Sequence, residues 1–183
     1  MGAIGRDATE APADAMTVLA EAVQWLSLAS SFEQIQAIVR RTARALTGAD
    51  GATFVLRERD QCFYVDEDAI APLWRGQRFP LVDCVSGWAM RHHEPAVIPD
   101  IEVDDRVPLA AYRPTFVRSL AMVPIGIETS VGAIGVYWAA PRRIAPGVLA
   151  DLQNLAQRTK DQIDRIGLDA APWAPTFGPT VSP

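Results

Sequence analysis

Residues 119–138 read SLAMVPIGIETSVGAIGVYW, and this stretch decides the fold class of the chain. Its two apolar segments, Ser119–Ile125 and Val131–Trp138, are separated by the polar residues Glu128-Thr129-Ser130. Short apolar runs that are bounded by a polar turn are typical of paired strands. The stretch therefore predicts a β-hairpin.

A second hairpin is predicted earlier in the chain, from Thr53–Arg57 and Cys62–Val65 with a polar turn between them. Residues 66–85 contain two prolines and a glycine without clear periodicity, which predicts a long irregular excursion. Ser86 is a candidate N-cap for a short helix, and Pro95–Pro99 predicts a short strand.

Helical periodicity flanks these strands on both sides. Met16, Leu19, Val23 and Leu26 follow helical spacing. A second helix is expected between an N-cap at Ser31 and a glycine at Gly48, with Ile35, Ile38, Val39, Thr42 and Leu46 facing inward. A third is expected from Pro146. Strands grouped between helices predict an α+β fold: an antiparallel sheet with the N- and C-terminal helices packed on one face.

The composition of the chain limits the classes of protein to which it can belong. The chain has 183 residues, 49% of them apolar and 21% charged, which suits one globular domain. A net charge of −5 gives no support for nucleic-acid binding, and two cysteines do not form a disulfide framework. No apolar run reaches the roughly 18 residues that would span a bilayer. We expect a soluble cytoplasmic protein with a flexible leader over 1–14 and a Pro-rich flexible tail over 168–183.

Four phrases in this order resemble the GAF domain family: FEQIQAIVRRTARALTGADGATFVL, CVSGWAMRHHEPAVIPDIEVDDR, VRSLAMVPI and VGAIGVYW. The resemblance places a GAF domain at residues 15–167 and implies a GAF/PAS-like sheet. YVDEDAIAPLW, GQRFP and AYRPTFVRSLAMVPI are more narrowly similar to GAF domains of bacterial sensor histidine kinases. The resemblance implies a non-catalytic sensor in signal transduction that binds a small molecule, forms a homodimer through its terminal helices and regulates a histidine kinase or another signalling partner.

In GAF domains the ligand lies between the sheet and the irregular segment, here about residues 66–118. Apolar walls with a few placed polar groups suit such a site. Loop aromatic residues also commonly pin a loop to the core, and arginines often lie on the surface. The candidate ligand-binding residues are Trp74, Phe79, Cys84, Trp88, Tyr112, Arg113, Arg118 and Met122.

Two other functions stay open. One is a thiol-dependent oxidoreductase that resembles free-methionine sulfoxide reductase and uses Cys84. That chemistry needs a resolving thiol, and the segment Asp104–Arg118 has none, so we interpret Cys84 as a packed thiol. The other is a ligand-free dimerisation module.

Other chemistry has weaker support. Covalent bilin attachment at residues 107–120 is excluded because this stretch lacks the Cys-His pair of bilin-binding GAF domains, although a non-covalent chromophore stays open. The Asn-Lys pair of cyclic-nucleotide GAF domains is missing too, although Arg113 or Arg118 could pair with a phosphate. Adjacent His92 and His93 diverge on a helix, so we expect a solvent-facing helix end and no metal site. We expect the acidic runs Asp66-Glu67-Asp68 and Glu102–Asp105 to be solvated loops.

Overall fold

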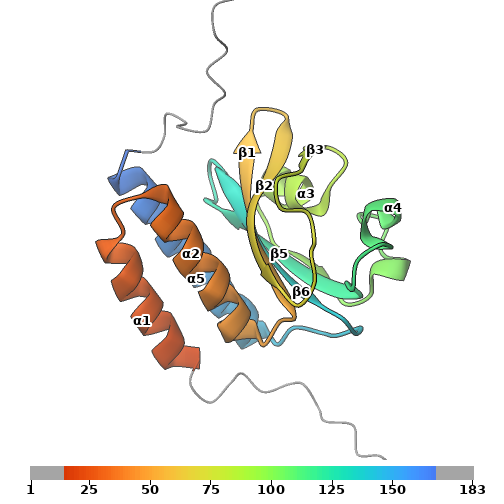
Figure 1. Ribbon diagram of the computed structural model, residues 1–183, viewed down its shortest axis with the longest axis horizontal. Helices are drawn as coiled ribbons and strands as arrows, with labels where there is room; N and C mark the ends of the chain where they lie inside the picture. The colour runs from red at the N-terminus through yellow and green to blue at the C-terminus, as the bar shows by residue number, and fades with distance from the viewer. Residues whose placement is uncertain (1–14, 168–183) are drawn as a thin grey trace, which may run out of the picture.

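Six antiparallel strands form one sheet with the order β3-β2-β1-β6-β5-β4 in the computed structural model, which describes residues 15–167 (Figure 1). The strands are β1 (Gly51–Glu58), β2 (Gln61–Ala69), β3 (Arg78–Pro80), β4 (Ala96–Ile98), β5 (Ser119–Ile125) and β6 (Gly132–Trp138). The central pairing of β1 with β6 brings the two predicted hairpins, β1–β2 and β5–β6, side by side. The expected α+β antiparallel architecture is confirmed.

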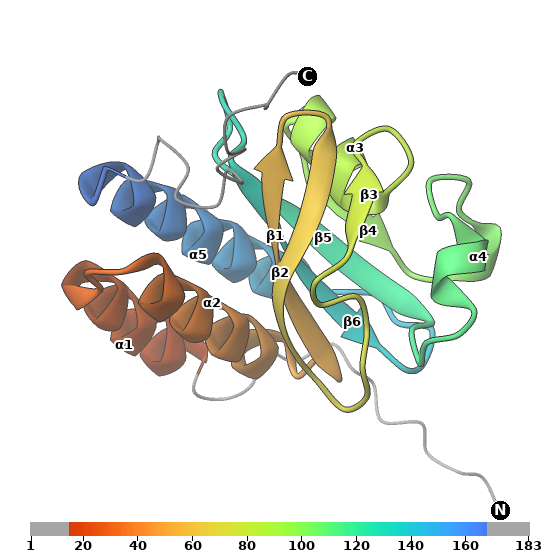
Figure 2. The ribbon, with the colours of Figure 1, turned by 45° about the horizontal axis from the view of Figure 1, so that its top comes forward.

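Three long helices cover one face of the sheet, as predicted (Figure 2). They are α1 (Ala15–Leu28), α2 (Phe32–Thr47) and α5 (Pro146–Arg165). Helices α2 and α5 pack on the strands, and α1 lies outside them against both. The amide Nε2 of Gln162 on α5 donates to the carbonyl of Ala29, which fixes the turn between α1 and α2.

The opposite face of the sheet carries the shorter elements α3 (Val85–His92), η1 (Ile101–Val103) and α4 (Leu109–Tyr112). Figure 2 shows α3 and α4 on the side of the sheet away from α5. The predicted loop segment therefore lies over this face. Each face has its own apolar core, because side chains alternate between the two faces along each strand.

Local signals explain where the helices begin and end. The Ser31 hydroxyl accepts from the N–H of Gln34, and Gly48 ends α2 with a φ of 59°, a left-handed conformation that suits glycine. Pro146 occupies the first turn of α5. These predictions are confirmed, as is the exposed helix end at His92 and His93.

Three local predictions are wrong. Strand β2 continues to Ala69, and β3 interrupts the expected irregular segment, because strand pairing compensates for weak periodicity. Cys84, and not Ser86, is the N-cap residue of α3, and the buried Ser86 hydroxyl bonds to other side chains. Met16, expected on an apolar stripe, is 86% exposed.

One irregularity in β2 changes which way its acidic residues face. Phe54 of β1 pairs with Asp66, whereas Val55 pairs with Tyr64, so Val65 is an extra residue in the ladder. Such a β-bulge shifts the alternation of side chains beyond it. Asp66 therefore faces α2, and Glu67 faces the other side of the sheet.

No helix among residues 15–167 has the length and apolarity to cross a membrane. The predicted leader, residues 1–14, and the predicted tail, residues 168–183, lie outside the described residues.

Candidate functional site

Four buried aromatic side chains meet between the sheet and the segment that covers it. Trp74 is central: its ring centroid lies 4.7 Å from that of Tyr112 and 5.5 Å from those of Tyr64 and Tyr137, with edge-type geometry in each pair. The Trp74 indole N–H donates to the carbonyl of Ala111 at 3.2 Å. We call these four residues the aromatic cluster.

Tyr137 reaches across a glycine to its hydrogen-bond partner. Thr53 of β1 lies opposite Gly135 of β6, two residues from Tyr137 and therefore on the same face. The Tyr137 hydroxyl lies 2.9 Å from Thr53 Oγ1. A Cβ at Gly135 would lie 2.3 Å from the Tyr137 oxygen, so only glycine leaves space for this contact.

A chain of polar side chains extends from Tyr64 to the two thiols. The Tyr64 hydroxyl lies 3.1 Å from Ser86 Oγ, and Ser86 Oγ lies 3.3 Å from Cys84 Sγ. Cys62 of β2, two residues before Tyr64 and on the same face of the sheet, interacts electrostatically with Cys84. All four residues are buried, so these polar side chains connect β2 to the first turn of α3.

Tyr112 differs from the other three residues of the aromatic cluster, whose polar side-chain groups are hydrogen-bonded. Its side chain is 3% exposed, and its hydroxyl has no hydrogen-bond partner among the described residues. A buried hydroxyl without a partner costs about 1–3 kcal/mol relative to a satisfied one. Burial raises the pKa of Tyr112, and likewise those of Tyr64 and Tyr137, above the usual value of 10.0, so all three phenols carry their protons at neutral pH.

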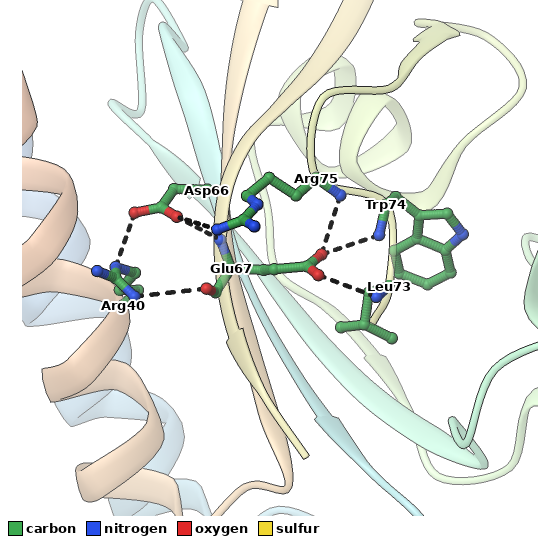
Figure 3. A network of polar contacts seen from close by, with 6 residues as sticks. All are labelled: Arg40, Asp66, Glu67, Leu73, Trp74 and Arg75. Atoms are coloured by element: carbon green, nitrogen blue, oxygen red, sulfur yellow. Dashed lines mark hydrogen bonds and ion pairs between the residues drawn. The ribbon is translucent and has the colours of Figure 1, made fainter. Parts of the chain in front are cut away.

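Glu67 positions the loop that carries Trp74 (Figure 3). One carboxylate oxygen, Oε1, accepts from the N–H of Leu73 at 3.1 Å. The other, Oε2, accepts from the N–H groups of Trp74 and Arg75, each at 2.9 Å. Three backbone donors converge on one side chain, and hydrogen bonds to a carboxylate are stronger than those between neutral groups.

The neighbouring aspartates connect β2 to α2. Asp66 Oδ2 lies 2.7 Å from Arg40 Nε, and Asp68 Oδ1 lies 2.6 Å from Arg44 Nη1. Figure 3 shows Asp66 and Glu67 pointing to opposite sides of β2. The expectation that Asp66-Glu67-Asp68 forms a solvated loop is wrong, because strand alternation and the bulge give every carboxylate a partner.

The pKa values of the two thiols are shifted in opposite directions. The interaction with the Cys62 thiol is the main cause that lowers the pKa of Cys84 from 9.0, and the Ser86 hydroxyl and the Gly87 N–H add to it. The same interaction and burial raise the pKa of Cys62. Cys84 is therefore the more nucleophilic sulfur of the two at neutral pH.

The structure brings half of the predicted ligand-binding residues together. Trp74 and Tyr112 belong to the aromatic cluster, and Cys84 and Met122 belong to the same apolar core. Phe79 is half-buried, with its ring centroid 5.5 Å from that of Tyr64.

The other three predicted residues do not belong to the aromatic cluster, although Trp88 packs against the same apolar core. Arg113 and Arg118 are exposed to solvent. Trp88 stacks on His92 with ring centroids 4.3 Å apart, and the Arg106 guanidinium lies 4.7 Å above its ring. Among residues 15–167, no three side chains of the metal-binding types lie together as a metal site.

Several residues of the site were missing from the sequence prediction. Tyr64, Tyr137 and Thr53 lie on strands that were predicted, and strand alternation together with the opposed Gly135 could have identified them. Ser86 was assigned to a helix cap. Cys62 was not recognised as the neighbour of Cys84, because only the tertiary structure brings β2 to the start of α3.

The sequence model of the GAF domain matches residues 31–162. No curated protein matches the chain in sequence. Solved structures show the same fold. The GAF domain of an Acinetobacter phosphoenolpyruvate-protein phosphotransferase is 14% identical, with a TM-score of 0.72 over 84% of this chain and 95% of that one.

Two further structures are similar to this chain. Free methionine-R-sulfoxide reductase from Neisseria meningitidis, in complex with its substrate, is 17% identical with a TM-score of 0.70, over 90% of this chain and 94% of that one. The chromophore-binding domain of bacteriophytochrome RpBphP3 from R. palustris is 17% identical with a TM-score of 0.70, over 82% of this chain and 61% of that one. At these identities the likeness concerns the fold.

Proposed function

The chain belongs to the GAF domain family, whose members are mostly sensory and regulatory modules, and on that premise we propose that it is a non-catalytic sensor that binds a small molecule at the aromatic cluster. The observation that carries this proposal is the buried Tyr112 hydroxyl without a partner. A ligand with one polar group for this phenol and an apolar body for the rings of Trp74 and Tyr137 suits the arrangement.

If ligand binding is to act as a signal, it must change the contacts of the helices. The Trp74 loop is held by Glu67, the adjacent Asp66 holds Arg40 of α2, and α2 packs against α1 and α5. A ligand that moves the Trp74 loop changes the contacts of β2 with α2. The shift is limited by the difference in the affinities of the ligand for the two arrangements.

The output of this sensor, in our proposal, is a change in the packing of a homodimer. Trp25 and Leu28 are 62% and 73% exposed, and they lie one helical turn apart on the outer helix α1. Apolar side chains of this size on an outer helix support pairing with a second copy. We place the protein in the cytoplasm, where free thiols are common, with a histidine kinase or another signalling protein as its partner.

The ligand test begins with protein purified under native conditions, followed by mass spectrometry for a co-purified small molecule. That molecule is then added to ligand-free wild type and to Tyr112→Phe, and the unfolding temperature is measured. At a concentration of about 100 times Kd, a ligand stabilises its protein by about 2.7 kcal/mol. We expect the ligand to stabilise wild type by this amount and to stabilise Tyr112→Phe by much less.

Two results would redirect the proposal. An equal gain in both proteins would place the ligand away from Tyr112. No co-purified molecule, together with no thermal shift from a library of small aromatic and heteroaromatic metabolites, would leave a ligand-free dimerisation module.

The proximity of Cys62 to Cys84 favours a second candidate, a thiol-dependent oxidoreductase, because it supplies the neighbouring thiol that such chemistry needs. The test is turnover of free methionine sulfoxide with dithiothreitol as reductant. Turnover that disappears in Cys84→Ala would support the enzyme, and no turnover in wild type would remove it.

A further inference from the structure

The two cysteines of the chain lie on different elements and meet in the second core. Cys62 lies on β2, opposite Phe79 of β3, and Cys84 is the N-cap residue of α3. Ser86 Oγ lies 3.3 Å from Cys84 Sγ and 3.1 Å from the hydroxyl of Tyr64, which lies two residues after Cys62 and on the same face of β2. Both thiols are buried in the same apolar core and interact electrostatically, so β2 and the start of α3 meet where the two cysteines lie.

The two thiols differ in access and in acidity. Cys62 is completely buried, whereas Cys84 is 6% exposed. Cys84 also lies at the N-terminal end of α3, where free N–H groups favour a thiolate. Cys84 is therefore the more accessible of the two sulfurs to a small oxidant.

We propose that Cys62 and Cys84 are a redox-responsive pair that a hydroperoxide converts into an intrachain disulfide joining β2 to the first turn of α3. This proposal goes beyond the proposed sensor function and does not depend on a ligand. The disulfide would close the loop that carries Trp74, because that residue lies between the two cysteines in the sequence.

The chemistry proceeds in two balanced steps. In the first, the Cys84 thiolate attacks the terminal oxygen of the hydroperoxide, the O–O bond breaks, and the products are a sulfenic acid and an alcohol, or water from hydrogen peroxide. In the second, Cys62 sulfur attacks the Cys84 sulfur, the S–O bond breaks, and hydroxide leaves with the Cys62 proton as water. The sulfurs together lose two electrons, and the peroxide gains them.

The chain has only two cysteines, so counting free thiols gives a direct test. Reduced full-length protein is treated with hydrogen peroxide at neutral pH, denatured in acid, and labelled with an alkylating reagent before and after reduction. We expect the untreated chain to take two labels, and the oxidised chain to take none until it is reduced. Peptide mass spectrometry should find Cys62 linked to Cys84 within one chain.

Single variants separate the two steps. Cys62→Ala should stop at the sulfenic acid of Cys84, which a dimedone probe traps, and Cys84→Ala should keep Cys62 unoxidised under the same conditions. Far-UV circular dichroism checks that each variant is folded, and the wild-type label count stands even if one is not. Wild type that keeps both labels, forms only links between chains, or accumulates sulfinic acid at Cys84 overturns the proposal.

Discussion

The N–H of Trp74 donates to the carboxylate of Glu67 at 2.9 Å, so the central ring of the aromatic cluster is positioned by a strand residue whose neighbour, Asp66, holds α2. The adjacent residues Asp66 and Glu67 thus contact opposite sides of the sheet. A displacement of the Trp74 loop or of α2 can therefore be transmitted to the other side through these two residues.

Glu67→Gln tests this anchor. The neutral amide accepts more weakly than the carboxylate and turns an NH₂ group toward one set of backbone donors, so we expect a loss of about 1–3 kcal/mol in the free energy of unfolding. Urea denaturation measures it, and hydrogen exchange of the amides of Leu73, Trp74 and Arg75 should become faster. The exposed Glu21→Gln is the control. Unchanged exchange at these three amides would contradict the anchoring role.

Tyr112→Phe and Tyr137→Phe form a matched pair. The Tyr112 hydroxyl has no partner among the described residues, so removing it should leave stability unchanged or raise it by about 1 kcal/mol. The Tyr137 hydroxyl bonds to Thr53 Oγ1, so its removal leaves a buried hydroxyl unpaired and should cost about 1–2 kcal/mol. Thermal unfolding of the two variants decides, and equal losses would show that Tyr112 is satisfied in the protein.

Gly135→Ala should destabilise the fold. The added Cβ would lie 2.3 Å from the Tyr137 oxygen and 2.7 Å from Thr53 Oγ1, so the hydrogen bond must break or the strands must shift, at a cost of about 1–3 kcal/mol. Gly147→Ala is the control: its Cβ meets no described atom within 4 Å in the first turn of α5, and alanine should stabilise by up to about 1 kcal/mol. Chemical denaturation compares the two, and a neutral Gly135→Ala would rule out the close packing of Tyr137.

The pair of Asp104 and Arg106 predicts a pH dependence. The hydrogen bond from Arg106, 2.7 Å at its shortest, lowers the pKa of Asp104 below its usual 3.8. A lowered folded-state pKa means that the stabilisation is present above the unfolded-state value and is lost as pH falls through the folded-state value. Asp104→Asn should therefore lower the free energy of unfolding by on the order of 0.5–1 kcal/mol near pH 7. The difference from wild type should vanish at a pH below the folded-state pKa of Asp104.

Denaturation curves of wild type and Asp104→Asn at several pH values measure this difference. The exposed Asp105→Asn serves as the control, with an expected effect within about 0.5 kcal/mol throughout. A difference for Asp104→Asn that persists unchanged in acid would mean that the charge of the carboxylate is not its cause.

The strands, the long helices and the family could be predicted from the sequence because their signals are local. Alternation and polar turns define the hairpins around β1–β2 and β5–β6, and Ser31 and Gly48 mark the ends of α2 through hydrogen bonds within a few residues. The aromatic residues Trp74 and Tyr112 were also identified, since few loop residues are large and apolar. Their role as ligand-binding residues stays a prediction.

The partners of the site residues were decided by the tertiary structure alone. A one-residue bulge at Val65 turns Glu67 toward the Trp74 loop and Asp66 toward α2, and a regular strand would reverse both. Likewise, Cys62 contacts Cys84 only because the chain between them folds back over β2. Local sequence determines how the backbone is hydrogen-bonded within a few residues, whereas the direction of each side chain across the sheet depends on strand register, which distant pairings set.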